Sequence, residues 1–241
     1  MPPEPRTTVR GKQATARRSD RYRTPVPDVI LPVLNEAGNL AWIFERMPPG
    51  FTPIVVDNGS SDGSGDIARS HGVLVIDEPV RGFGSACWAG LQACRDEIVC
   101  FMDADGSLDP LALPFVAGLV EHGDADLVVA RRIADRGAWP LHTRVANRVV
   151  AAQLGRRSGV RLHDLGPMRA ARREVLLGLG MQDRRSGWPL EMVLRAERAG
   201  LTVREVALPY HRRHSGRSKE TGTLRGTARA VVDMSRLLRK L

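Results

Sequence analysis

The stretch Glu97-Ile-Val-Cys-Phe-Met-Asp-Ala-Asp-Gly106 decides the fold, because an apolar run ends abruptly at two aspartates. The apolar part has the length and composition of a strand buried on both faces. Asp103 and Asp105 are spaced i and i+2, so both carboxylates can face one hard cation such as Mg²⁺ or Mn²⁺. An isolated Asp-x-Asp more often marks a loop or a helix cap. Its place directly after this strand favours a cation site that would neutralise a leaving diphosphate.

Four other short apolar runs alternate with stretches of helical character. The predicted strands are residues 28–34, 54–57, 73–77 and 126–130, and the predicted helices between them are about 36–47, 62–70 and 85–95. This alternation predicts an α/β protein with a mostly parallel sheet and helices on both faces. Ligands of such sheets bind at the carboxyl ends of the strands. The polar residues that follow the strands are Asn35, Glu36, Asp57 and Asn58, and we expect them at the same edge as Asp103.

The second half of the chain has a looser pattern. We predict helices at 139–154, 171–179 and 188–199 and a strand at 201–207. This half is expected to complete the site and to supply specificity.

Length and composition exclude several classes of protein. A chain of 241 residues with 42% hydrophobic content can bury a core without a disulfide or a structural metal. Its three cysteines, Cys87, Cys94 and Cys100, are odd in number and lie in apolar segments, which indicates a reducing compartment. No apolar run reaches the length of a membrane span, and the basic N-terminus has no apolar signal core. We therefore expect a cytoplasmic protein, with peripheral attachment to the inner face of the membrane as an extension of that expectation.

The positive charge lies at the two ends of the chain. The formal net charge is +9, of which residues 1–27 carry +5 and residues 211–241 carry +7, whereas residues 28–210 carry −3. Residues 1–27 are predicted to be a disordered basic arm, either a solubilising tail or a segment attracted to anionic lipid. Residues 223–241 are predicted to be a basic amphipathic helix that lies in a membrane interface or packs on the body. Residues 28–222 form the predicted globular domain between them.

Three further motifs carry candidate chemistry. Gly82-Phe-Gly84 lacks the third glycine of a dinucleotide fingerprint and follows the wrong strand, so it either offers backbone amides to an anion or is a simple turn. Glu191, at a predicted helix start, is either a capping residue or a general base for an alcohol acceptor. The segment 210–219 concentrates four cationic side chains, which suit phosphate oxygens or form a solvated loop. Nucleic acid is disfavoured as a partner, because only 5% of the residues are aromatic.

Taken together, these motifs resemble those of family 2 glycosyltransferases with the GT-A fold, and most closely the dolichol- or polyprenyl-phosphate sugar transferases. The resemblance covers roughly residues 28–230. It rests on the ordered motifs Leu31-Pro-Val-Leu-Asn-Glu36, Val55-Val-Asp-Asn-Gly-Ser-Ser-Asp-Gly63, Arg81-Gly-Phe-Gly84, Asp103-Ala-Asp105, His163-Asp-Leu-Gly-Pro-Met-Arg169 and Gly216-Arg-Ser-Lys219.

The resemblance implies a role for each matching residue. The residues implied to bind the nucleotide sugar are Pro32, Asn35, Glu36, Asp57, Asn58, Gly82, Gly84, Asp103 and Ala104. Asp103 and Asp105 are the implied ligands of Mg²⁺ or Mn²⁺, and Asp105 and Arg132 are the implied catalytic residues. Glu191 is a third catalytic candidate, on its sequence context rather than on the resemblance. Arg213, Ser218 and Lys219 are implied to bind an acceptor phosphate.

The sequence departs from the family pattern at several positions. The usual Asp-Asp pair is Asp57-Asn58, the residue two places after the Asp-x-Asp is Ser107 rather than Gln, and Ala130-Arg131 replaces a Gly-Ser. The transmembrane helices of some relatives are absent from this sequence.

The implied reaction is a single inverting displacement on a UDP- or GDP-sugar. If the acceptor is a polyprenyl phosphate, it is already anionic and needs no strong base; if it is a soluble hydroxyl compound, Glu191 is the leading base. A nucleotidyltransferase and a non-enzymatic basic binding protein are the alternatives from other classes. The first should carry a basic glycine-rich loop after the first strand, and the second gives no reason for acidic strand ends to converge.

Overall fold

The computed structural model describes residues 26–138, 141–158, 162–216, 232 and 234. Strands and helices alternate through the first half of the chain, as the sequence predicts. Its elements are β1 (Asp28–Val33), α1 (Ala37–Glu45), β2 (Thr52–Asp57), α2 (Ser64–Ser70), β3 (Leu74–Asp77), α3 (Phe83–Ala93) and β4 (Ile98–Phe101). The second half contains a short 3-10 turn (Pro110–Ala112), α4 (Leu113–Glu121), β5 (Leu127–Ala134), α5 (Leu141–Ser158), β6 (Arg169–Arg172), α6 (Arg173–Gly178), α7 (Trp188–Arg198) and β7 (Val203–Tyr210).

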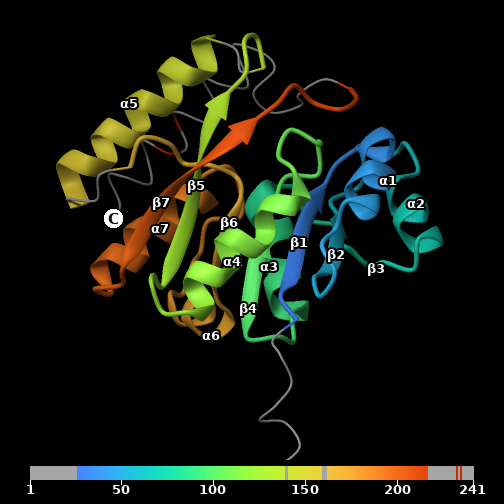
Figure 1. Cartoon of the computed structure of the whole chain (residues 1–241), viewed down its shortest axis with the longest axis horizontal. Coiled ribbons are helices and arrows are strands. Elements are labelled where there is room, and N and C mark those ends of the chain that lie inside the picture. Colours follow the sequence, from blue (N-terminus) through green and yellow to red (C-terminus); the bar gives the residue numbers. More distant parts are fainter. Residues whose placement is uncertain (1–25, 139–140, 159–161, 217–231, 233, 235–241) are drawn as a thin grey trace, which may run out of the picture.

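The strands form one seven-stranded sheet in the order β3-β2-β1-β4-β6-β5-β7. β6 is antiparallel to both of its neighbours, β4 and β5, whereas β5 and β7 are parallel. Every strand except β6 therefore runs in the same direction, and the carboxyl ends of these strands meet at one edge (Figure 1). The predicted mostly parallel α/β architecture is confirmed.

The strand β6 corrects one sequence prediction. We predict a helix from Ala171, but Ala171 and Arg172 belong to β6 and the helix begins at Arg173. Arginine and alanine favour helices, so the four residues of β6 carry no strand signal of their own. Their pairing between β4 and β5 decides their conformation. Helix α4, to which no predicted element corresponds, is preceded by Asp109, whose side chain accepts a hydrogen bond from the Leu111 amide.

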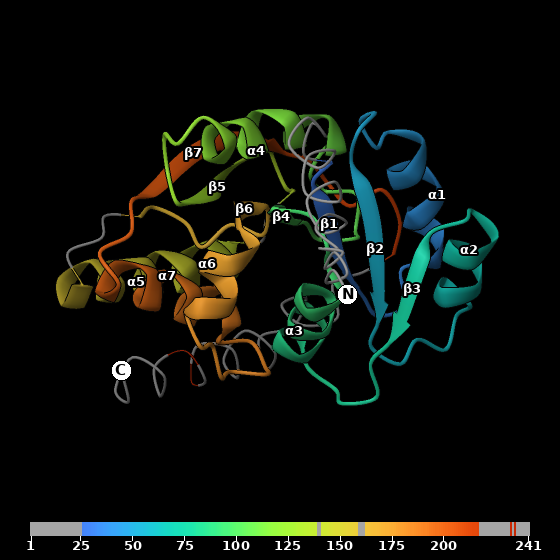
Figure 2. The same cartoon turned by 90° about the horizontal axis from the view of Figure 1, so that it is seen from below.

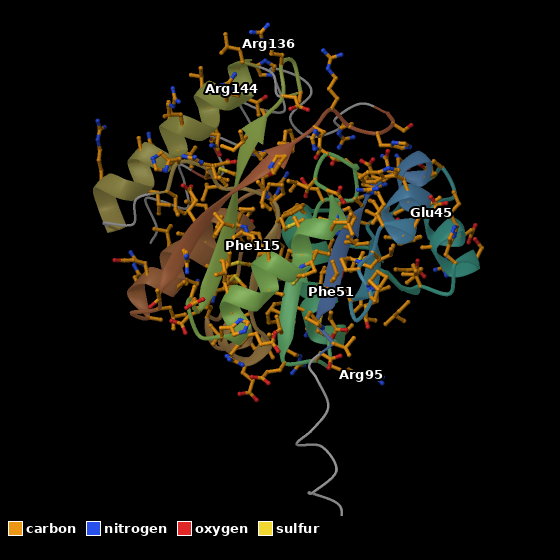
Figure 3. All side chains as sticks on the ribbon, viewed as in Figure 1. Glu45, Phe51, Arg95, Phe115, Arg136 and Arg144 are labelled. Atoms are coloured by element: carbon orange, nitrogen blue, oxygen red, sulfur yellow. The ribbon has the colours of Figure 1, made fainter. Side chains whose placement is uncertain are left out.

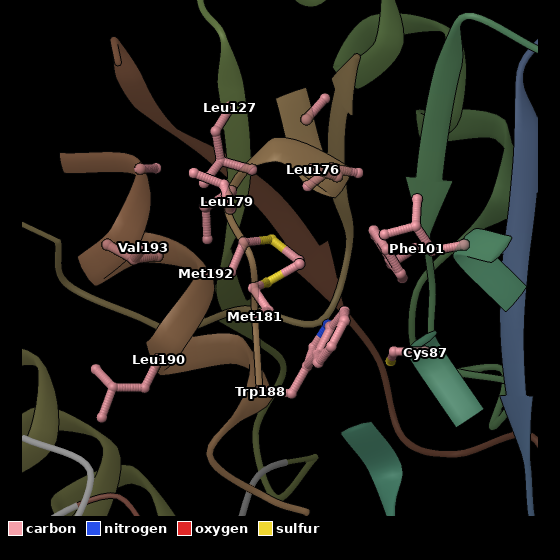
Figure 4. Close-up of a cluster of buried hydrophobic side chains, with 14 of the residues drawn as sticks. Cys87, Phe101, Leu127, Leu176, Leu179, Met181, Trp188, Leu190, Met192 and Val193 are labelled. Carbon is pink, nitrogen blue, oxygen red and sulfur yellow. The ribbon is translucent and has the colours of Figure 1, made fainter. Parts of the chain in front are cut away.

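The alternation of side chains along each strand divides the core between the two faces of the sheet. Val29, Leu31 and Val33 of β1 pack in one cluster with residues of α1 and α4, while Ile30 packs in the other with residues of α3, α6 and α7. Figure 2 shows α4 on one side of the sheet and α3, α6 and α7 on the other. Trp188 lies near Met181, Met192 and Cys87 in the second cluster (Figure 4). Helices thus cover both faces of the sheet, and the carboxyl ends of the strands are left for ligands.

The predicted terminal segments fall largely outside the described residues. Nothing in the structure tests the predicted arm at 1–27, and within the predicted helix at 223–241 only Val232 and Met234 are described. The domain boundaries therefore stay predictions. The long helix predicted at 139–154 corresponds to α5.

Candidate active site

The loops after β1 and β2 are tied together by side chains that bond to backbone amides. The Asn35 amide donates to Ser60 Oγ at 2.8 Å, and Asn35 Oδ1 accepts from the Ser61 amide at 2.7 Å. The Glu36 amide donates to Ser64 Oγ at 2.9 Å. Asn35 has a φ of 55°, a left-handed conformation that asparagine tolerates better than most residues. The first predicted nucleotide loop is therefore held in place by the second.

Asp57 and Asn58 have different surroundings at the end of β2. Asp57 Oδ1 accepts from the Ser60 amide at 2.7 Å. The buried Asn58 side chain donates to the carbonyls of Glu78 and Val80, at 3.0 and 2.8 Å, and accepts from the Gly82 amide at 2.8 Å. An aspartate could not donate these two hydrogen bonds, which explains in physical terms why this position is an amide. Asn58 closes the loop 78–82 over the end of β2.

The two glycines of the Gly82-Phe-Gly84 loop allow a close approach between backbones. A Cβ atom at Gly82, where φ is +149°, would lie 2.1 Å from the Arg184 carbonyl oxygen, and one at Gly84 would lie 2.6 Å from the Asp183 oxygen. The Gly84 amide donates to the Arg185 carbonyl and the Ser85 amide to the Arg184 carbonyl. The predicted use of these amides for an anion is therefore not what the structure shows. They hold the segment 183–185 against the start of α3.

The Asp-x-Asp pair follows β4, at the edge where the carboxyl ends meet. Asp105 is 5% exposed; its Oδ1 accepts from the Ser107 amide at 2.9 Å and from the Ser107 hydroxyl, and its Oδ2 lies 3.0 Å from Arg213 Nε. Ala104 between the aspartates is buried in the core, and Asp103 is partly exposed. The carboxylate Oδ2 of Asp105 already carries a cationic partner, so its position suits a positive charge.

A divalent cation fits the chemistry of these donors. The carboxylates of Asp103 and Asp105 are the hard oxygen ligands that Mg²⁺ and Mn²⁺ prefer. Among the residues that the structure describes, no group of three or more His, Cys, Asp or Glu side chains is close enough to hold a metal ion. A cation bound by the two aspartates would therefore complete its shell with water and ligand oxygens.

Arg132 is placed by an aspartate that the sequence prediction missed. Arg132 Nε and Nη2 donate to the two oxygens of Asp164 at 2.8 and 2.7 Å, and the Arg132 amide donates to Asp164 Oδ2 at 2.9 Å. Burial lowers the pKa of Arg132, but the hydrogen bonds and charge of Asp164 outweigh it, so this pKa is raised. Asp103 contributes to the same rise, and the guanidinium lies over the Tyr210 ring at 5.6 Å. Arg132 is thus a fixed cation on the Asp103 side of the edge.

Arg169 on β6 is a second buried guanidinium near this edge. Its Nη1 donates to the Pro189 carbonyl at 2.7 Å and its Nε to the Gly166 carbonyl at 3.0 Å, whereas Nη2 is buried without a hydrogen-bond partner among the described residues. Burial lowers the pKa of Arg169 to about 10. The sequence signal was the last residue of the motif His163–Arg169, which includes Asp164 as well.

The segment 211–215 returns to the Asp-x-Asp after β7. Arg213 Nη1 lies 3.3 Å from Glu36 Oε1, and its Nε contacts Asp105. The amide of His214 donates to the Asp105 carbonyl at 3.2 Å, and its ring stacks on Trp42 of α1 with centroids 5.4 Å apart. The structure therefore brings together Glu36, Asp105 and Arg213, which are far apart in the sequence. Ser218 and Lys219 lie outside the described residues.

Glu191 is not placed as a free base. It is 1% exposed, and its carboxylate accepts from the amides of Gln182 and Asp183 at 2.6 to 3.0 Å. It also pairs with Arg195 Nε at 2.6 Å, one turn further along α7. These contacts hold the segment before α7, including residues 182 and 183. The contacts give Glu191 a structural role that differs from the predicted helix cap, because the amides that it accepts from precede α7 and α7 has no side-chain cap hydrogen bond. They also engage both carboxylate oxygens, one of which a general base would need.

A mostly parallel sheet with an Asp-x-Asp and arginines at its carboxyl edge defines the class of nucleotide-diphosphate-sugar transferases with the GT-A fold. The chain belongs to glycosyl transferase family 2, whose model matches residues 28–179. The protein is therefore a glycosyltransferase that uses a nucleotide sugar. The family and fold inferred from the motifs are confirmed.

Three relatives illustrate the range of similar proteins. A protein of Mycobacterium tuberculosis named an uncharacterized glycosyltransferase is 43% identical over 211 residues, which are 87% of this chain and 96% of the relative. The polyprenol monophosphomannose synthase of Mycolicibacterium smegmatis is 32% identical over 218 residues, 81% of each chain. The glucosyl-3-phosphoglycerate synthase of M. tuberculosis, solved with Mn²⁺, UDP-glucose and phosphoglyceric acid, has a TM-score of 0.72 and 26% identity over 89% of this chain and 80% of the other.

Proposed function

We propose that the protein transfers a sugar from a UDP- or GDP-sugar to a polyprenyl phosphate, with inversion and with a divalent cation as cofactor. The observation that carries this proposal is the convergence of Arg132 and Arg213 on the edge that holds Asp103 and Asp105. Guanidinium groups are well suited to phosphate oxygens. A donor diphosphate and an acceptor phosphate are the two anions that such an edge would need to bind. The likeness to a polyprenol monophosphomannose synthase supports the same acceptor class.

Each residue then has a role that its position supports. Pro32 lies in β1 and, with Asn35, Glu36 and Asp57, would contact the nucleoside from the interlocked loops after β1 and β2. Asn58, Gly82 and Gly84 would hold the neighbouring loops in place through their contacts within the protein rather than by binding the ligand. Ala104 would contribute its backbone between the two aspartates.

The reaction is a displacement at the anomeric carbon of the sugar. An oxygen of the acceptor phosphate forms a bond to this carbon while the bond to the donor diphosphate breaks, and the electron pair leaves with the nucleoside diphosphate. A cation on Asp103 and Asp105 would stabilise the charge of that leaving group. Arg213, with Ser218 and Lys219, would orient the acceptor phosphate. No general base is needed, which agrees with the full set of partners on Glu191.

Helix α5 supports a peripheral contact with the membrane. Leu141, Val145 and Val149 recur at a spacing of four residues and are 73%, 55% and 45% exposed. The exposed Arg144 and Arg148 lie beside them, and α5 contains no acidic residue. An exposed apolar stripe flanked by arginines fits the headgroup region of an anionic bilayer. No helix in the described part of the chain is long and apolar enough to cross a membrane.

The position of this helix relative to the site agrees with a lipid acceptor. α5 begins close after β5, one of the strands that end at the site edge (Figure 1). Arg136, in the connection between β5 and α5, and Arg144, near the start of α5, project from the end of the molecule where β5 ends (Figure 3). A membrane that contacts the start of α5 would therefore present its phosphate-bearing lipids near that edge.

The experiment is an acceptor assay with extraction. Purified protein is incubated with Mg²⁺, short-chain polyprenyl phosphate and radiolabelled UDP- or GDP-sugars, and the label is extracted into organic solvent. We expect label in the organic phase from one donor, and none when Mg²⁺ is chelated with EDTA. Absence of organic label with every donor, in a protein shown to bind a nucleoside diphosphate by thermal shift, contradicts the lipid acceptor.

A second candidate acceptor is a soluble phosphorylated compound. It is favoured by the fold likeness to glucosyl-3-phosphoglycerate synthase, which was solved with phosphoglyceric acid. The same arginines would suit this anion. A parallel reaction with phosphoglycerate in place of the lipid separates the two acceptors, because its labelled glycoside stays in the aqueous phase and is resolved from the nucleotide sugar by chromatography.

A further inference from the structure

Arg213 contacts two acidic groups, Glu36 and Asp105, of which Asp105 belongs to the candidate cation site. Its guanidinium lies between Glu36 Oε1, at 3.3 Å, and Asp105 Oδ2, at 3.0 Å, and both carboxyl side chains are less than a tenth exposed. The Arg213 side chain itself is 22% exposed. Since the other oxygen of Asp105 is engaged by Ser107, Oδ2 is the oxygen that Arg213 and a metal ion would share.

The backbone around Arg213 is fixed by several separate contacts. The His211 amide donates to the Ser107 carbonyl at 2.9 Å, and the Ser215 carbonyl accepts from Asn39 Nδ2 at 3.4 Å. His214 stacks on Trp42, and a Cβ atom at Gly106 would lie 2.7 Å from the His214 Cβ. These contacts hold the backbone of segment 211–215 against α1 and the loop after β4. The Arg213 side chain can therefore change partner by rotation while the segment stays docked.

A guanidinium and a divalent cation compete for the same carboxylate oxygen. Positive charges a few ångströms apart repel, so a cation bound at Asp105 weakens the binding of a second cation to the same carboxylate. A cation that binds Asp105 would therefore weaken the ion pair between the Arg213 guanidinium and Asp105. The acceptor phosphate of the proposed function then offers oxygens that the released guanidinium can bind.

We propose that Arg213 is a displaceable counter-cation of Asp105 that couples metal binding to acceptor binding. Before the donor binds, Arg213 neutralises Asp105 and Glu36; the divalent cation then takes its place on Asp105 and frees the guanidinium for the acceptor phosphate. Metal and acceptor phosphate therefore favour one another's binding, and thermodynamic linkage makes this effect equal in both directions. The acceptor half of the inference rests on the proposed function; the metal half does not.

The first test measures Mn²⁺ alone, without donor or acceptor. The free-ion EPR signal gives the Mn²⁺ dissociation constant of the wild type, Arg213→Gln, Arg213→Lys and Arg212→Gln. We expect Arg213→Gln to bind Mn²⁺ about fivefold or more tightly, because a competing cation is removed. Arg213→Lys keeps the charge and should stay near the wild type. Arg212, whose guanidinium contacts the Arg136 carbonyl, is the matched control and should show no change.

Unchanged or weaker Mn²⁺ binding in a folded Arg213→Gln variant overturns the proposal, as does equal tightening in Arg212→Gln. Circular dichroism establishes that each variant is folded, and Arg213→Lys provides a second variant of the same position. None of these outcomes depends on which acceptor the enzyme uses, so the metal test and the acceptor assay can fail separately.

The second test measures coupling in the wild type. Binding of short-chain polyprenyl phosphate is titrated by calorimetry with and without Mg²⁺ and the nucleoside diphosphate that stabilises the protein. We expect Mg²⁺ to tighten acceptor binding about fivefold or more in the wild type and to have little effect in Arg213→Gln. Equal tightening in both proteins contradicts the role of Arg213 in the coupling.

Discussion

The loops after β1 and β2 are held in a different way from the arginines on the other side of the site. In the first region, Ser60, Asp62, Ser64 and Asp57 accept hydrogen bonds from backbone amides of the two loops. Such bonds depend on the path of the backbone and need no ligand to complete them. In the second region, charged side chains meet charged side chains, so an incoming ion can replace a partner. The first region is built before substrate arrives, whereas the second can respond to it.

The two arginine pairs of the second region also differ from each other. Arg132 meets Asp164 with two parallel hydrogen bonds and with its own backbone amide. Arg213 divides its guanidinium between two acids, with Nη1 3.3 Å from Glu36 Oε1 and Nε 3.0 Å from Asp105 Oδ2. Bidentate pairs are stronger and more specific in geometry. Arg132 is therefore suited to a fixed position and Arg213 to exchange.

The largest expected effect comes from removing the negative charge of Asp105. Asp105→Asn should reduce sugar transfer by roughly a thousandfold or more, because a preorganised charge in the site is lost. The measurement is the initial rate at saturating donor and Mg²⁺, with the fold checked by circular dichroism. Asp109→Asn, four residues away and paired with Arg46, is the matched control and should retain nearly full activity. A comparable loss in both variants would point to a general structural effect.

The next largest effect concerns the fixed arginine pair. Asp164→Asn should lower the free energy of unfolding by about 3–5 kcal/mol, since the Arg132 guanidinium stays buried without its anion. The Asp164 side chain is 2% exposed and that of Arg132 is 15% exposed. Urea unfolding measures the change.

The exposed pair between Glu97 and Arg172 is the contrast for that measurement. Glu97→Gln should cost less than about 1 kcal/mol, because solvent screens this pair. Similar losses from Asp164→Asn and Glu97→Gln would show that burial does not distinguish the two.

Much of the nucleotide half could be predicted from the sequence. Apolar runs such as Ile54–Asp57 are short, are bounded by polar residues and alternate with helices, so local pattern and final structure agree. The edge that carries Asn35, Asp57 and Asp103 follows from the rule that parallel strands end together. These predictions needed only local periodicity and one rule of topology.

The rest depends on contacts between distant residues. β6 is a strand because it fits between β4 and β5, and its residues Arg169–Arg172 have no strand pattern. Asp164 lies 32 residues from the Arg132 that it pairs with, and Glu36 lies 177 residues from Arg213. The sequence alone does not show which charged residues pair with one another. Glu191 shows the same limit, because only the structure reveals that backbone amides and Arg195 engage its carboxylate.

A smaller effect tests the close backbone approach at Gly82, whose amide donates to Asn58 at the end of β2. Gly82→Ala should lower the free energy of unfolding by roughly 2–4 kcal/mol, because the new Cβ would lie 2.1 Å from a backbone oxygen of Arg184. Gly63→Ala is the matched variant: its φ is also positive, +84°, but nothing lies within 4 Å of the Cβ. It should cost only about 1–2 kcal/mol, the strain of the left-handed conformation. Thermal or urea unfolding of both variants measures the difference, and equal costs would contradict the close approach.

The smallest expected effect tests how the loops after β1 and β2 are joined, and it depends on pH. Asp62 Oδ2 accepts from the Ala37 amide at 3.0 Å, and Oδ1 accepts from the Ser64 amide and hydroxyl at 3.0 and 2.6 Å. Burial raises the pKa of Asp62, but these hydrogen bonds outweigh it and hold the pKa below its ordinary value of 3.8. The carboxylate is thus favoured in the folded state.

A lowered folded-state pKa means that the ionised group stabilises the protein above the unfolded pKa, and that this contribution is lost as the pH falls through the folded value. Asp62→Asn should therefore cost no more than about 1 kcal/mol at pH 7, because the side chain is exposed and solvent screens its charge. The difference from the wild type should begin to shrink below about pH 4, where Asp62 of the unfolded chain becomes protonated, and should fade as the pH falls through the lower pKa of the folded state. Urea unfolding of both proteins between pH 3 and pH 7 measures it. A difference that stays constant over this range would mean that the Asp62 carboxylate does not join the loops through its charge.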